Sequence, residues 1–252
     1  MNSKFSWILL LLTPVFFIIT HDIAYFAHEY AHSFSAWTFG FKTNPFALHY
    51  GSLNWNNLLN LSEVSENVDY KSVEQASRLK AAFIAFSGAG IGNCLLFTIA
   101  IIAINTKKPH SKIYYYFFSW LIVMNLGNFI DYIPIRTFAS HGDIHEIIIS
   151  LNISPWWIMI VLGYPIIYAV WYFYSTILCN VYVKMSFNKV EQSIFLILVT
   201  FTLFILFGTT GIRNYGSDPH LLSLLSIYFS PILVIACWPQ RSWVCEKTKK
   251  SF

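Results

Sequence analysis

Long stretches without any charged residue constrain this chain more than any other feature. Five such stretches occur, at 81–106, 113–130, 147–183, 192–212 and 221–240. An α-helix rises about 1.5 Å per residue, so each is about long enough to cross a hydrocarbon core of about 30 Å. In the third stretch, Ser154 and Pro155 resemble the turn that precedes a helix, which predicts a helix start near Pro155. We therefore expect five membrane helices from these stretches.

The amino-terminal segment is less uniform. Between Lys4 and Lys42 the only formal charges are Asp22 and Glu29. A lysine before an apolar stretch resembles a signal peptide, but no small-residue cleavage pattern follows and the apolar character continues to Gly40. We interpret the segment as a retained membrane helix, which predicts an all-α, multi-pass membrane protein with about six transmembrane helices. The composition agrees, because 11% of the residues are charged, against about 25% in soluble domains.

No internal repeat or low-complexity tract divides the chain, so we expect one membrane domain over 1–252. Residues 1–150 would form its core, and 151–252 would add further transmembrane helices. Only 40–80 is polar enough to lie outside a membrane. Within it, 46–53 could form a short strand, and 73–80 is expected to begin the second membrane helix.

The basic residues indicate an orientation. With six spans, one side of the membrane collects ten of them: Lys4, Lys107, Lys108, Lys112, Lys184, Lys189, Arg241, Lys247, Lys249 and Lys250. The other side collects six: Lys42, Lys71, Arg78, Lys80, Arg136 and Arg213. Cytoplasmic loops carry the excess of Lys and Arg, so both termini are expected in the cytoplasm. The net charge of +4 is spread over loops and tail and gives no reason to expect nucleic-acid binding.

Residues 28–32 read His-Glu-Tyr-Ala-His, which is the spacing HExxH. On a helix, His28 and His32 lie one turn apart on one face, so both imidazoles can bind a single Zn²⁺ at about 2.0–2.1 Å. Glu29 can then take a proton from water and return it to a leaving amine. Ionisable groups within an apolar helix are costly and usually mark function. The pattern predicts a hydrolytic zinc site with Glu29 as the catalytic base and acid.

A catalytic zinc needs a third protein ligand and keeps one position open. The richest polar cluster elsewhere is 141–146, His-Gly-Asp-Ile-His-Glu, just after the third expected span. By the six-span count, this span ends on the side of the membrane that also holds the second half of the first helix. The clusters at 28–32 and 141–146 can therefore meet. Asp143 is therefore the first choice for the third ligand, His141 is the alternative, and His145 comes after both.

Three features in order resemble the site-2 protease family of intramembrane zinc metalloproteases. The first is the motif at 28–32, and the second is 87–93, Ser-Gly-Ala-Gly-Ile-Gly-Asn, which is similar to the small-residue motif opening the family's second core helix. The third feature consists of Asn125, Asn128, Pro134, Gly142 and Asp143. These residues resemble the family's Asn…Pro…Asp-Gly motif, with a wider spacing and with acid and glycine in reversed order. The resemblance covers about residues 15–150.

The resemblance implies a zinc endopeptidase that cleaves peptide bonds of a membrane-anchored protein substrate, with a regulatory membrane protein as a further partner. Asn93 and Asn128 would then hydrogen-bond an unwound substrate backbone, which needs such partners in lipid. The segment 40–60 could add an edge strand for the same purpose. Asp131 stays a weaker candidate for the third ligand.

Two other function classes fit part of the pattern. His28 and His32, like His141 and His145, form an HxxxH pair, as in membrane di-iron hydroxylases and desaturases. Those enzymes usually have more histidines, with adjacent His-His, which this chain lacks. The second alternative is a non-catalytic metal-binding membrane protein, such as a transporter or an inactive protease homologue. Metal content separates the three classes: one zinc, two irons, or a weakly held exchangeable metal.

Overall fold

The structure, a computed structural model, describes residues 3–55, 57, 61, 63–212 and 215–239. All regular structure in this part of the chain is helical, so the all-α prediction is confirmed. The α-helices are α1 Ser3–Leu11, α2 Thr13–Thr38, α4 Tyr70–Ala76, α5 Arg78–Ser87, α6 Cys94–Asn105, α7 Lys112–Ile130, α8 Asp143–Leu151, α9 Pro155–Tyr172, α10 Leu178–Met185, α11 Lys189–Phe201 and α12 Ser217–Ala236. Wider π-helical turns continue four of them, at η1 Gly88–Asn93, η2 Asp131–Ile135, η3 Phe173–Ile177 and η4 Thr202–Phe207, and a short 3₁₀ turn, η5, spans Thr210–Ile212.

Five helices of the described chain are long and apolar enough to cross a membrane. They are Arg78–Asn105, Lys112–Ile135, Pro155–Met185, Lys189–Ile212 and Ser217–Ala236, and each overlaps one of the charge-free stretches. The predicted helix start at Pro155 is confirmed, and the Ser154 hydroxyl caps it by accepting from the backbone N–H of Trp156. Arg213, Gln240 and the basic residues after Gln240 lie outside the described residues.

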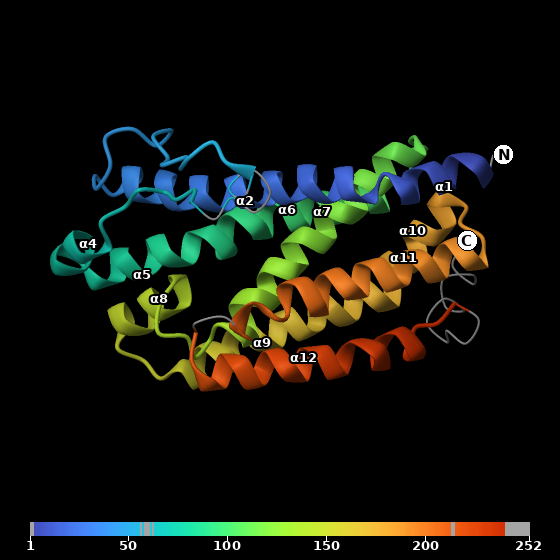
Figure 1. Cartoon of the computed structure of the whole chain (residues 1–252). Helices are drawn as coiled ribbons and strands as arrows, with labels where there is room; N and C mark the ends of the chain where they lie inside the picture. The colour runs from blue at the N-terminus through green and yellow to red at the C-terminus, as the bar shows by residue number, and fades with distance from the viewer. Residues whose placement is uncertain (1–2, 56, 58–60, 62, 213–214, 240–252) are drawn as a thin grey trace.

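The helix α2 does not belong to these five. Its 26 residues correspond to about 39 Å, which is long enough, but His21, Asp22, His28, Glu29 and His32 make it more polar. Five spans, not six, therefore meet the requirement by length and composition among the described residues. The helix packs along α5, η1 and α7 (Figure 1).

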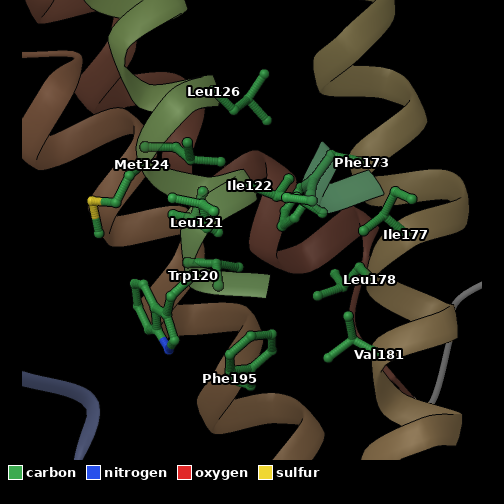
Figure 2. Packing of buried hydrophobic residues seen from close by; sticks show 14 of the residues in the cluster. Trp120, Leu121, Ile122, Met124, Leu126, Phe173, Ile177, Leu178, Val181 and Phe195 are labelled. Carbon is green, nitrogen blue, oxygen red and sulfur yellow. The ribbon is translucent and has the colours of Figure 1, made fainter. Parts of the chain in front are cut away.

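The helix α7 forms the centre of the molecule and crosses diagonally between the other helices (Figure 1). It is buried on nearly all sides, and Trp120 and Ile122 are fully inaccessible. Figure 2 shows Phe173 and Val181, from η3 and α10, and Phe195, from α11, packing toward it. By contrast, the continuous helices Pro155–Met185 and Ser217–Ala236 are each 17% buried along their most apolar stretch. An apolar helix with so much outward-facing surface suits contact with lipid.

The described part of the segment 41–69 lies beside α2 and contains no regular strand, so the strand expected at 46–53 is wrong. The only strand-like pairing described there is a single antiparallel bridge between His49 and Ser65. The Glu63 carboxylate accepts from the backbone N–H and the hydroxyl of Ser52, and the Asn57 amide donates to backbone carbonyls. These side chains form hydrogen bonds with backbone N–H and C=O groups that would otherwise pair with a neighbouring strand.

The second membrane helix begins later than expected. The range 73–80 is divided at Ser77, whose backbone is extended (φ −165°, ψ 109°). The Ser77 hydroxyl then accepts from the backbone N–H of Lys80 and caps α5. Serine competes for backbone N–H groups in this way at helix starts, which explains why α4 and α5 are separate helices.

Candidate metal centre

The two histidines of the HExxH motif lie on the inward face of α2. His28 is 4% exposed and His32 is 1% exposed. Their Nε2 atoms lie 2.9 Å apart, and the rings meet edge to face, with centroids 4.6 Å apart. The spacing of four residues therefore brings both side chains to one point, as the helical periodicity predicts.

Hydrogen bonds at the far side of each ring determine where its proton lies. His32 Nδ1 lies 2.6 Å from the carbonyl oxygen of Ile84. A carbonyl only accepts, so Nδ1 carries the hydrogen and Nε2 presents a lone pair. His28 Nδ1 lies 2.8 Å from the side-chain oxygen of Asn93. Both imidazoles therefore present an unprotonated Nε2 to the same space.

The orientation of the Asn93 amide is itself determined by its neighbours. Its Nδ2 donates to the backbone oxygen of Ala24 and to the side-chain oxygen of Asn125, each at 3.0 Å. The Asn125 amide nitrogen in turn donates to the backbone oxygen of Leu121 at 2.7 Å. The Asn93 oxygen must therefore face His28, so a chain of hydrogen bonds from α7 holds this imidazole in one tautomer.

Asp143 completes the group from the first turn of α8. Its Oδ2 lies 3.0 Å from His28 Nε2 and 3.2 Å from His32 Nε2. Gly142 precedes it with a φ of +93°, which few side-chain-bearing residues adopt, so the glycine allows the chain to turn toward α2. Burial alone would raise the pKa of Asp143, but His32 and His28 outweigh that effect and lower this pKa well below its ordinary value.

Three lone-pair-bearing atoms thus converge, at separations of 2.9, 3.0 and 3.2 Å. Tetrahedral ligands at about 2.0–2.1 Å from Zn²⁺ lie about 3.3–3.4 Å from one another. The observed triangle is close to that size, so a metal ion between the three atoms could bind all of them. Among the described residues, His28, His32 and Asp143 form the group that could hold a metal ion.

The small-residue stretch at 87–93 explains how the helices approach this closely. A Cβ added to Gly88 would lie 2.3 Å from His32 Nε2 and 2.5 Å from His28 Nε2. Any side chain at this position would therefore occupy the space in which the two imidazoles meet. This glycine is required by the site itself as well as by helix packing.

Glu29 lies beside the group and is 7% exposed. Its carboxyl interacts electrostatically with His32 and Asp143, and also with Glu66 from the irregular segment. Sequence reasoning did not single out Glu66, because nothing in the pattern of 41–69 indicates that this segment returns to α2. The carboxyl of Glu29 is therefore close enough to the group to act on a molecule bound there.

The remaining predicted ligands do not join the group. His141 is exposed and stacks on Tyr215, with ring centroids 4.5 Å apart. Asp131 pairs with Arg136, whose Nε donates to its Oδ1 at 2.9 Å. His145 is half-buried on α8. The two HxxxH pairs thus do not meet, so the second pair expected for a di-iron site is lacking.

Two polar side chains on the α7–η2 helix reach the site although neither of them had a predicted role in it. Asn125, and not Asn128, contacts Asn93, and Asn128 is half-buried on α7. The Tyr132 hydroxyl lies 3.0 Å from His28 Nε2, and its ring stacks on that imidazole, with centroids 5.2 Å apart. Tyr132 follows Asn125 by seven residues, so helical periodicity could have indicated that it shares the site-facing side.

Replacing Asn93 with leucine is expected to weaken zinc binding by about 10–100-fold, because partners that orient a metal-binding histidine typically contribute that much. The measurement is zinc affinity by competition with a chelator. Asn128→Leu is the matched control on α7 and should leave the affinity unchanged. Thermal unfolding of the zinc-free variants would show whether a change arises from the site, and equal affinities in both variants would contradict the role of Asn93.

Comparisons with known proteins give no relative. No family model matches the sequence, no curated protein matches it, and no solved structure matches its fold.

Proposed function

We propose that this protein is an intramembrane zinc metallopeptidase of the site-2 type, which hydrolyses peptide bonds of a membrane-anchored protein. The observation that carries the proposal is the meeting of two Nδ1-protonated histidines with the Asp143 carboxylate. Two nitrogens and one oxygen, with room for a further ligand, are the donor set of a catalytic zinc site. The buried Glu29 beside them supports hydrolysis over simple metal storage.

His28, His32 and Asp143 would hold the zinc, which supplies Lewis acidity for the attack of water on a peptide carbonyl. Glu29 takes a proton from the attacking water while the oxygen of that water bonds to the carbonyl carbon. Glu29 then delivers that proton to the amide nitrogen as the C–N bond breaks, which gives a carboxylic acid and an amine. Asn93 keeps the His28 imidazole in the required tautomer throughout.

Substrate contact is proposed on two sides of this centre. The described part of the segment 40–60 would pair with an extended polypeptide, since His49 already forms one antiparallel bridge there. Asn128 remains the proposed side-chain contact to an unwound substrate on α7. Asn93 is fully buried, and its hydrogen bonds are within the protein, so its contribution is to position His28.

The helix α2 is proposed as a sixth span, because its polar side chains turn inward toward neighbouring helices, as ionisable groups within membranes usually do. The excess of basic residues then predicts that both termini are cytoplasmic. Reporter fusions at the carboxyl terminus and next to Ser217 would test this, with the first active in the cytoplasm and the second outside. An external carboxyl terminus would reverse the orientation and leave the metal site unaffected.

The function is tested with the purified full chain in detergent. We expect one zinc per chain by elemental analysis, and cleavage of a membrane-anchored reporter protein that stops on chelation and returns when zinc is added. Two irons per chain would favour a hydroxylase. Full zinc occupancy without cleavage of any membrane-anchored reporter in a panel would favour a non-catalytic metal-binding protein.

A further inference from the structure

A cavity of about 250 Å³ lies next to the metal centre and shares Asp143 with it. Its walls come from α5 and η1 on one side, from α8, and from α9 on the outer side. Asp143 and Tyr132 belong both to this cavity and to the surroundings of His28. A molecule bound at the open side of the metal group therefore has this space as its neighbour.

The lining of the cavity is otherwise apolar. Among the described residues, Asp143 is the only charged one in its walls, which also include Phe86, Ile144 and Ile166. Small residues at Ala89 and Ala169 leave the space open. A cavity of about 150 Å³ lined by aliphatic and aromatic side chains accepts benzene, so this one has room for a phenyl or isobutyl group. The cavity therefore suits an apolar group.

From this geometry we infer that the cavity is a specificity subsite for one large apolar side chain, of the leucine or phenylalanine class, next to the scissile bond. The inference rests on the proposed peptidase function. A polypeptide whose carbonyl lies at the metal centre carries a side chain within a few ångströms of that carbonyl, and this apolar cavity borders the centre at Asp143 and Tyr132. A leucine or phenylalanine side chain gains about 10–100-fold in affinity when it is buried from water, which is enough to select the cleavage position.

The test uses acetylated amino-acid hydroxamates that differ only in their side chain, with the zinc-loaded full chain in detergent. The hydroxamate binds zinc whether or not the protein cleaves peptides, so affinity is read independently of activity. We expect the leucine and phenylalanine compounds to bind about 10–100-fold more tightly than the alanine compound. Equal affinities, or no binding by any compound, would overturn the subsite; equal affinities are also expected if a lipid chain fills the cavity.

Variants of α9 sharpen the result. Ala169→Phe should fill the cavity and remove the preference for large side chains, while leaving the alanine compound bound as in the wild type. Ile166→Ala should enlarge the cavity and favour a tryptophan compound. A gained preference of this kind would show that changes in this part of α9 alter the cavity and do not simply misfold the protein. Ile160→Phe is the matched control, because Ile160 is 62% exposed on the same helix and does not line this cavity.

Failure of the subsite and failure of the function are distinguishable. Graded hydroxamate affinities in a chain that cleaves no membrane-anchored reporter would retain the subsite and reject the peptidase. Cleavage of a reporter together with equal hydroxamate affinities in all variants would retain the peptidase and reject the subsite.

Discussion

Replacing Glu29 with glutamine is expected to reduce peptide-bond hydrolysis by at least about 10²–10⁴-fold, the usual contribution of general acid–base catalysis, and to leave one zinc bound per chain. Glutamine has nearly the same shape as glutamate but cannot accept the proton of the attacking water. Glu29 is buried beside the metal group and is not one of its ligands. The two measurements are the cleavage rate of a membrane-anchored reporter and the zinc content of the same preparation.

A carboxylate elsewhere provides the control. Glu74 forms a long contact of 3.8 Å with an exposed Arg78, and such surface pairs contribute little to stability. Glu74→Gln should therefore match the wild type in both measurements. Cleavage by the Glu29→Gln protein at the wild-type rate would reject Glu29 as the base, and loss of zinc from it would indicate that Glu29 supports the ligands as well.

The membrane helices could be predicted from sequence because each of the five depends on one local property. A stretch without charge that is long enough to cross a bilayer has few alternatives to a helix, since every backbone group must find its partner within the segment. The boundary at Pro155 was equally local, because a serine cap and a proline in the first turn act over a few residues. Such signals do not depend on what the helix packs against.

The segment 41–69, by contrast, could not be predicted from local signals. A short strand was expected at 46–53, yet side chains of Asn57 and Glu63 hold the backbone in turns instead. Glu66 reaches α2 by way of this segment. Both features depend on contacts between residues far apart in the chain, and a periodic pattern within eight residues contains no information about such contacts.

In the metal centre, too, local spacing predicted some residues, whereas others depend on contacts between distant parts of the chain. His28, Glu29 and His32 follow from helical spacing alone, and Asp143 was chosen by counting spans, which gives the side of the membrane but no distance. The resemblance pointed to Asn128 as a substrate contact, which stays a prediction, and the structure adds Asn125 as the partner of Asn93. A difference of three residues nearly completes one helical turn, so both asparagines fit the sequence pattern.

Replacing Asp143 with alanine is expected to lower zinc affinity by more than about 100-fold, which exceeds the usual effect of losing a group that only orients a ligand, and to abolish activity. Without this carboxylate, His28 and His32 supply two neutral ligands, and the nearby carboxyls of Glu29 and Glu66 do not belong to the ligand group. Both the zinc content and the cleavage rate should fall together. Asp143→Asn should retain part of the affinity, because an amide oxygen can still bind the metal but carries no charge.

His145→Ala is the matched control, since His145 lies two residues further along α8 and outside the metal group. It should keep near-normal zinc affinity, which would show that α8 has not been displaced. His141→Ala should also stay near normal, because its ring stacks on Tyr215 and not on α2. Asp131 is a poor control, because its removal would leave the buried end of Arg136 unpaired and destabilise the fold. Full zinc occupancy in Asp143→Ala, together with its loss in His141→Ala, would instead establish a site of three histidines and require α8 to move toward α2 when the metal binds.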